Sequence, residues 1–214
     1  MKYPVFLGID LTSSEAEPSA CVGLDGKSEL VYFGFVAKDE DIVALLDFYS
    51  PEVVAIDAPL SLPVGLCCLE DACRCKTRSG RKTRQCDYEL RRLGIPCYPT
   101  SKKTFIKDLI YRGIALKASI CRDAKQASQV IEVYPFASKV RLFGETVPRK
   151  TTGQGITFHR AKLAEILPGL EPYLDVFDHD LCDAAMAAHT AFLHSQGRTQ
   201  ALGDPQEGLI LIPV

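Results

Sequence analysis

Two aspartates lie at or near the ends of stretches that are expected to be core strands. Asp10 follows the first apolar run, in PVFLGIDLT (4–12), and Asp57 lies in the second, in PEVVAIDAPLSLP (51–63). Continuous apolar runs of this length are typical of strands that are buried on both faces of a sheet. An ionised carboxylate at such a position is costly unless it is paired or bound to a metal ion. The two acids are therefore candidates for chemistry.

Two more aspartates open an alanine-rich stretch, DHDLCDAAMAAHTAFLHSQG (178–197), that is expected to form a helix. Asp178 occupies the position of an N-cap, where its side chain can accept hydrogen bonds from free backbone amides. Asp180 and Asp183 are three residues apart and share a helix face. One interpretation is a solvated first turn stabilised by the helix dipole; the other is that this pair joins Asp10 and Asp57.

The second interpretation predicts a metal site with catalytic function. Ligands that are all carboxylate oxygens suit Mg²⁺ or Mn²⁺ better than zinc. Two such ions about 4 Å apart activate water and stabilise the leaving oxygen in phosphodiester hydrolysis.

The elements that would position these acids indicate an α/β fold. Two short apolar runs follow the first strand within residues 19–37 and are separated by the hairpin signal Asp25-Gly26. A helix is expected at 39–49 and a strand at 51–63, which predicts a mixed sheet with the first three strands antiparallel and Asp10 beside Asp57. The remaining expected elements are helices at 103–124, 159–170 and 178–197 and strands at 129–136 and 207–214.

The chain has 214 residues, of which 47% are hydrophobic, and this is enough for one sizeable core. Residues 74–107 contain 11 of the 25 Lys and Arg and only two acids, so this stretch carries a formal charge of +9 and the remainder −11. We expect one domain, 1–214, with 64–104 as an inserted basic, cysteine-rich subdomain that follows a phosphate backbone. No apolar run approaches the length of about 20 residues that spans a bilayer, and membrane partners are not expected.

Five cysteines lie within the 20 residues 67–86, a stretch that overlaps this basic segment. Thiolates at this density suit zinc or, less well, an iron–sulfur cluster; free thiols are the alternative. The N-terminal sequence has no features of a signal peptide, which together with nine cysteines in the chain predicts a reducing, cytoplasmic location. The possible ligands are Cys67, Cys68, Cys73, Cys75 and Cys86.

The motifs GIDLTSS, AIDAPLSLP, CDYELRRLGIPCYP, EVYP, DHDLCDAAMAA and GDPQEGLILIP together resemble the family called domain of unknown function 429. Members of that family are predicted nucleases with an RNase H-like fold, and two acids three residues apart on the last helix are similar to the RuvC type of Holliday-junction resolvase. The resemblance spans nearly the whole chain. It implies a hydrolase and adds Glu132 as a fifth acid at the metal site, with a structural hydrogen-bond acceptor as the alternative. The expected phosphate-binding residues are Arg84, Arg91, Arg92, Lys102 and Lys103.

Two other functions remain open at this point. The segment GIDLTSSEAEPSACVGLDG also resembles the first phosphate loop of actin-like and sugar-kinase-like phosphotransferases, although the chain is short for two such domains and would need a homodimer. A non-catalytic nucleic-acid binding module is the third possibility. Nucleic acid, DNA or RNA, is the expected partner in the first and third cases.

Overall fold

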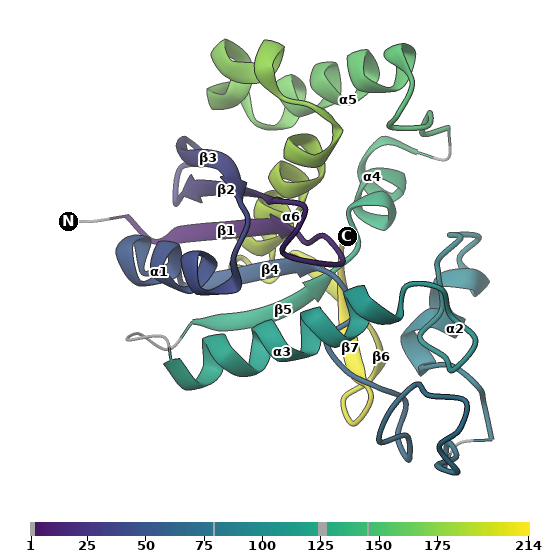
Figure 1. The fold of residues 1–214 in the computed structure, drawn as a ribbon. Helices are drawn as coiled ribbons and strands as arrows, with labels where there is room; N and C mark the ends of the chain where they lie inside the picture. Colours follow the sequence, from purple (N-terminus) through teal and green to yellow (C-terminus); the bar gives the residue numbers. More distant parts are fainter. Residues whose placement is uncertain (1–2, 79, 124–127, 145) are drawn as a thin grey trace.

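The protein is described by a computed structural model that covers residues 3–78, 80–123, 128–144 and 146–214. Its centre is a seven-stranded mixed sheet with the strand order β3-β2-β1-β4-β5-β7-β6 (Figure 1). The strands are β1 (Val5–Asp10), β2 (Ser19–Asp25), β3 (Leu30–Val36), β4 (Val53–Asp57), β5 (Gln129–Val133), β6 (Thr199–Asp204) and β7 (Gly208–Pro213).

The directions of the strands confirm the expected α/β fold. β1, β2 and β3 are antiparallel, β4 is parallel to β1, β5 is parallel to β4, and β7 is parallel to β5. A three-stranded antiparallel meander continued by parallel strands on its inner side is the arrangement of an RNase H-like sheet. Asp10 and Asp57 are directly paired in the register of β1 and β4, as predicted.

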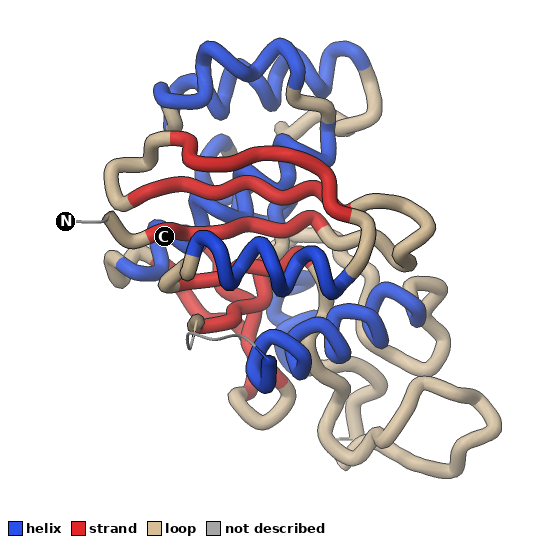
Figure 2. The backbone as a smooth tube through the Cα atoms, turned by 60° about the vertical axis from the view of Figure 1, so that its left-hand side comes forward, coloured by secondary structure: helices blue, strands red, loops and turns tan. Residues whose placement is uncertain are grey.

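Helices cover both faces of the sheet (Figures 1 and 2). On one face, α1 and α3 pack against apolar side chains of β1, β2 and β4. On the other face, α6 lies across the sheet, and α5 and the 3₁₀ helix η1 pack with it over β2. The helices are α1 (Asp39–Tyr49), α2 (Gln85–Arg92), α3 (Lys107–Asp123), α4 (Pro135–Phe143), α5 (Gly153–Ile166), η1 (Pro168–Val176) and α6 (His179–Ser195).

α6 lies unusually close to β1, and this explains its alanine-rich sequence. A Cβ atom on Gly8 would lie 2.1 Å from the carbonyl oxygen of Ala184 and 2.2 Å from the amide nitrogen of Ala188. Such distances are possible only for glycine, and small side chains on the helix allow the same approach. The start of α6, which carries the acid pair, is thereby held against the strand that carries Asp10.

We predict that Gly8→Ala will destabilise the protein by about 1–3 kcal/mol, the usual cost of overpacking a core. The methyl group would meet backbone atoms of α6, which cannot move aside as a flexible side chain can. Gly153→Ala is a matched control, because a Cβ at this first residue of α5 meets nothing within 4 Å. Urea denaturation of both variants measures the difference, and an equal effect would contradict the close contact.

Some elements differ from the sequence expectation. The strand expected at 129–136 ends at Val133, because Pro135 begins α4, and proline is favoured in the first turn of a helix. α5 begins six residues earlier than expected, with Thr152 accepting a hydrogen bond from the Gly155 amide as its N-cap. β6 was not expected, because its sequence TQALGD contains little of the β-branched and aromatic content of typical strands.

The segment between β4 and α2 is long and irregular. Residues 58–84, apart from residue 79, contain no helix or strand, and they extend from the sheet at the lower right of Figure 1. Loops of this length are uncommon and are often functional. The division into a body and an inserted 64–104 subdomain stays a prediction; residue 79 of that segment and residue 124 of the helix expected at 103–124 lie outside the described residues. Among the described helices, none has the length and apolar character needed to cross a bilayer.

Candidate active site

The alternation of side chains along β1 and β4 directs two aspartates toward α6. Val53 and Ala55 of β4 pack against α6, and Asp57 continues this alternate set; Asp10 does the same in β1 after Phe6 and Gly8. Both acids therefore lie at the carboxyl ends of adjacent parallel strands, on the face that α6 covers.

The first two turns of α6 supply the other two acids. Asp178 caps the helix as predicted, accepting hydrogen bonds from the amides of Asp180 and Leu181. Asp183 is buried, whereas Asp180 is half-exposed. The Oδ1 atom of Asp180 forms a hydrogen bond with the Nδ1 atom of His179, at a distance of 2.6 Å. The four acids Asp10, Asp57, Asp180 and Asp183 thus come from three separate elements. Three of them, all except Asp180, line one cavity of about 620 Å³.

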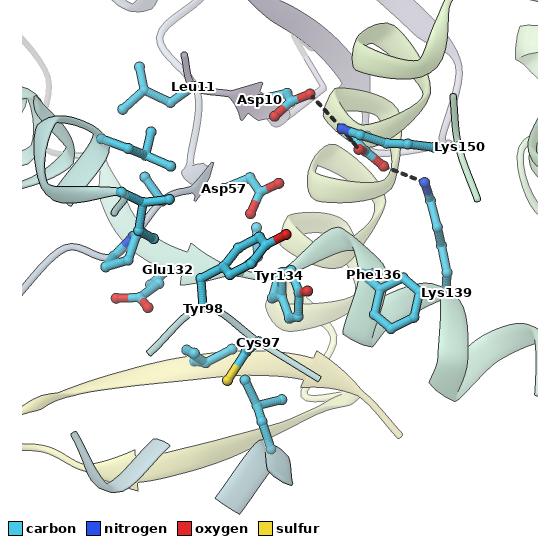
Figure 3. Close-up of a pocket in the computed structure, with 18 of the residues that line it drawn as sticks. Asp10, Leu11, Asp57, Cys97, Tyr98, Glu132, Tyr134, Phe136, Lys139 and Lys150 are labelled. Atoms are coloured by element: carbon cyan, nitrogen blue, oxygen red, sulfur yellow. Dashed lines mark hydrogen bonds and ion pairs between the residues drawn. The ribbon is translucent and has the colours of Figure 1, made fainter. Parts of the chain in front are cut away.

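Lys150 places its ammonium group among these acids (Figure 3). Its Nζ atom lies 2.5 Å from Asp183 Oδ2, 3.6 Å from Asp180 Oδ1 and 3.8 Å from Asp10 Oδ2. Burial favours the neutral amine, but Asp183 and Asp10 raise the pKa of Lys150 above its ordinary value. The protein itself therefore provides a cation at the point where its carboxylates converge.

A second lysine fixes Asp183. Lys139, from α4, is buried and forms an ion pair with the Asp183 carboxylate. Burial alone would raise the pKa of Asp183, but Lys139 and Lys150 outweigh it and hold the pKa below its ordinary value. Asp183 is consequently ionised, with one lysine on each oxygen.

The pKa values of the two strand acids, Asp10 and Asp57, are shifted in the opposite direction to that of Asp183. Burial, and then the charge of Asp183, raises the pKa of Asp57 to about 8. Burial and the neighbouring Asp57 raise the pKa of Asp10 well above its ordinary value as well. Among the residues that the structure describes, none donates a hydrogen bond or forms a salt bridge to the Asp57 carboxylate. With all four carboxylates ionised, the site would hold more negative charge than its two lysines neutralise, and the raised pKa values of Asp10 and Asp57 reflect this imbalance.

This imbalance predicts that, without divalent cations, the melting temperature falls as the pH rises from 6.5 to 8. In this range the folded state still binds a proton on Asp57 that the unfolded state has released, so unfolding becomes more favourable as the pH rises. For one proton, the free energy of unfolding falls by up to about 1.4 kcal/mol per pH unit. The melting temperature of a domain of this size then falls by roughly 3–5 °C per pH unit. Differential scanning calorimetry measures the slope.

The charged groups near Asp57 are Asp10, Asp183, Lys139, Lys150 and, on the other face of the sheet, Glu132. The pKa of Asp10 is raised in the same direction as that of Asp57. Asp57→Asn should reduce the slope, and Asp108→Asn, which changes an exposed acid on α3, should not. If the melting temperature of the wild-type protein did not change between pH 6.5 and 8, Asp57 would be ionised over this whole range.

One histidine on the same cavity was not identified from the sequence. His159 of α5 is buried, and its Nδ1 atom has no hydrogen-bond partner among the residues that the structure describes. Burial, followed by repulsion from Lys139, lowers the pKa of His159 to about 4, so the ring is neutral at physiological pH.

Glu132 was predicted as a fifth acid at this site; it lines the same cavity, but it is not one of the acids that contact Lys150. Glu132 is paired in register with Ile56, not Asp57, so its side chain lies on the α3 side of the sheet. In Figure 3 it lies beyond Asp57, away from Lys150. The alternative interpretation, a structural hydrogen-bond acceptor, describes it better.

Glu132 instead belongs to a buried network centred on Arg84. The two guanidinium NH groups of Arg84 donate to the two oxygens of Glu132 at 2.7 and 2.6 Å, and one of them also contacts Asp87 at 3.4 Å. The backbone amide of Leu60 donates to Glu132 at 2.8 Å. Arg84, predicted to bind phosphate, is only 1% exposed and has these partners instead.

A comparison with protein families gives a match to the family described as "Protein of unknown function (DUF429)" over residues 8–208. The chain belongs to this family. A search of curated proteins found no match. Among solved structures, one titled "Thermus thermophilus RuvC structure" is similar, with 14% identity over 90% of this chain and 96% of that chain and a TM-score of 0.47.

In this DUF429 protein the other predicted phosphate-binding residues lie outside the acidic cavity. Arg91 and Arg92, at the end of α2, and Lys103 are exposed. Lys102 is partly buried and donates a hydrogen bond to the backbone oxygen of Cys73. Three of the five predicted cations are thus exposed to solvent.

Four of the five cysteines predicted as possible metal ligands come together in this family member. The Sγ atoms of Cys67, Cys68, Cys73 and Cys75 all lie within 4.8 Å of one another. Cys86 is elsewhere: it is fully buried in an apolar cluster with Leu90 and other core residues.

Proposed function

We propose that this protein is a hydrolase that cleaves phosphodiester bonds in nucleic acid, with divalent cations held by Asp10, Asp57, Asp180 and Asp183. The observation that supports this most directly is the convergence of three carboxylates, from β1 and α6, on the Nζ atom of Lys150, with Asp57 of β4 paired in register beside Asp10. Structural acids in a core are normally paired one to one, whereas this group has four carboxylates and only two lysines.

The donor set fits Mg²⁺ or Mn²⁺. All four ligands offer hard oxygen atoms, and the Asp57 carboxylate has no partner of its own among the described residues. Two divalent cations at such a site activate water and stabilise the leaving oxygen of a phosphodiester. The ammonium group of Lys150 shows that a positive charge is stable at this position.

The surrounding residues have separate roles in this proposal. Lys139 is a positioning residue: it is buried, contacts Asp183 and fixes the orientation of that carboxylate. Lys150 is partly exposed and can hold an anionic phosphate oxygen when its contacts with the acids are exchanged. His159 is neutral and lines the same cavity, beside the lysines that contact Asp183.

The surface beside the cavity suits a nucleic-acid strand. Tyr98 lines the cavity and is 62% exposed, and Phe105, 77% exposed, contacts it edge to face with ring centroids 4.6 Å apart. Exposed aromatic rings next to exposed cations form a stacking platform for bases, with the cations on the phosphates. The nearby exposed cations are Arg74, Lys76, Arg78, Arg81, Lys82, Arg91, Arg92 and Lys103.

The experiment is cleavage of labelled duplex, branched, single-stranded and RNA–DNA hybrid substrates with Mg²⁺, Mn²⁺ or chelator. We expect cleavage of at least one substrate that depends on the cation and is lost with Asp10→Asn. Parallel assays of ATP hydrolysis and of binding by gel shift separate the alternatives. ATP turnover without cleavage would favour a phosphotransferase, and tight binding without cleavage would favour a binding module.

A further inference from the structure

The irregular segment between β4 and α2 contains a compact group of sulfur atoms. Cys67 Sγ and Cys73 Sγ are 3.5 Å apart, and all four sulfurs of Cys67, Cys68, Cys73 and Cys75 are within 4.8 Å of one another. Zinc bound tetrahedrally by thiolates at about 2.3 Å separates the sulfurs by about 3.8 Å. The observed group is therefore close to the size of a four-thiolate zinc site.

We propose that Cys67, Cys68, Cys73 and Cys75 bind one zinc ion in a closed structural site. This goes beyond the proposed hydrolase function, because it concerns different residues, a different metal and a different part of the chain. Four sulfur ligands leave no open coordination position, so the ion would stabilise the segment and take no part in the reaction.

The positions of the thiols favour metal binding over core packing. Cys67 is exposed, and the other three are partly exposed, whereas Cys21 and Cys182 are fully buried among apolar side chains. Four thiols that gather near the surface without joining an apolar cluster gain little from burial. Sulfur ligands are also soft, which excludes the Mg²⁺ or Mn²⁺ of the acidic site and suits zinc.

The charge around the thiols is also suitable. A zinc ion with four thiolates has a net charge of −2, and a run of basic residues begins at Arg74 and continues beyond Cys75, although Glu70 and Asp71 lie between the cysteines. Lys102, from the segment after α2, donates a hydrogen bond to the backbone oxygen of Cys73 and brings its charge to this group. The cations that would repel a bare metal ion thus stabilise the complete site.

The segment has few other means of holding its shape. Leu69 is fully buried and its amide donates to the hydroxyl of Tyr111, and the amide of Arg78 donates to the carbonyl of Val64. The amide of Cys73 also donates to the carbonyl of Glu70, and the hydroxyl of Tyr111 donates to the Glu70 carboxylate. A metal ion on the four thiols would add a direct link among residues 67–75 to these few hydrogen bonds. A zinc ion here would fix the exposed cations of residues 74–82 relative to the acidic cavity.

The test is the metal content of the full-length protein purified without chelator under reducing conditions. Inductively coupled plasma mass spectrometry should find about one zinc per chain, as for other closed thiolate sites. Cys73→Ser should lose most of the zinc, and Cys121→Ser, which changes an exposed cysteine on α3, should retain it. These measurements need no substrate and are independent of the proposed cleavage.

Two further measurements decide the role and exclude other thiol chemistry. Cobalt substitution should give the thiolate charge-transfer bands and tetrahedral ligand-field bands that Cys73→Ser lacks. Removal of the metal should increase the trypsin cleavage rate within residues 74–82 several-fold. The proposal is overturned if the reduced wild-type protein has four titratable thiols and no metal, if mass spectrometry finds Cys67–Cys73 as a disulfide, or if iron and sulfide replace zinc.

Discussion

Asp57→Asn is expected to abolish cation-dependent cleavage and to leave the protein folded. The substitution removes a ligand that has no other partner among the described residues, and it lowers the charge at the centre of the site. By analogy with losses of residues that act as a unit in other active sites, the rate should fall by about 10³-fold or more. Single-turnover cleavage with saturating Mn²⁺ measures this loss.

The stability of the same variant is a second readout. Because repulsion with Asp183 and Asp10 is relieved, Asp57→Asn should melt at the same or a higher temperature than the wild-type protein at pH 8 without metal. Mg²⁺ should stabilise the wild type and have a smaller effect on the variant. Asp183→Asn differs, because it leaves buried Lys139 without its partner and should be destabilised.

A double variant and a surface variant provide controls for this prediction. Asp10→Asn combined with Asp57→Asn should cost little more activity than either change alone, since each one already prevents correct cation binding. Asp108→Asn on the exposed surface of α3 should have full activity. Normal cleavage by Asp57→Asn, or a wild-type melting temperature that no divalent cation raises, would show that these acids are structural.

Arg84→Met is expected to cause the largest loss of stability, about 3–5 kcal/mol, the typical cost of removing one partner of a buried ion pair. Glu132 and Asp87 are both buried and would lose the cation that contacts them. Methionine retains much of the length of the side chain, so the loss would reflect charge more than volume. Urea denaturation measures the free energy of unfolding.

A double-mutant cycle separates the ion pair from other effects. Adding Glu132→Gln to Arg84→Met should recover part of the loss, because the remaining acid becomes a neutral acceptor for the Leu60 amide. Lys103→Met, on the exposed surface, is the matched control and should change stability little. Equal effects of Arg84→Met and Lys103→Met would contradict the buried network.

The residues that sequence reasoning found are those whose position follows from local pattern. Asp10 and Asp57 were identified because a single acid in an apolar run is unusual, and Asp178 because capping is a local property. Glu132 satisfied the same pattern, but its face depends on the register between β4 and β5. A register difference of one residue reverses the face of a side chain, and sequence does not reveal register.

Lys139 and Lys150 were missed for a related reason. Lysines on a helix or in a loop are usually solvated, and only the tertiary packing of α4 and of the segment before α5 brings these two to Asp183. Cys86 had a local signal that was not used: Leu90 follows it by four residues, so the two share the buried face of α2. That spacing separates Cys86 from the four surface cysteines.

The position of α6 in the chain has a consequence for the order in which the protein can fold during its synthesis. β1, β2 and β4 are made early, but the helix that covers one of their faces begins only at His179. A nascent chain that has not passed this point exposes an apolar sheet surface and has strand acids without their helix partners. Lys139 and Lys150 precede Asp183, so both counter-ions are present before the buried aspartate arrives. Nascent chains halted before residue 178 should therefore need chaperones to stay soluble, and they should remain susceptible to proteolysis.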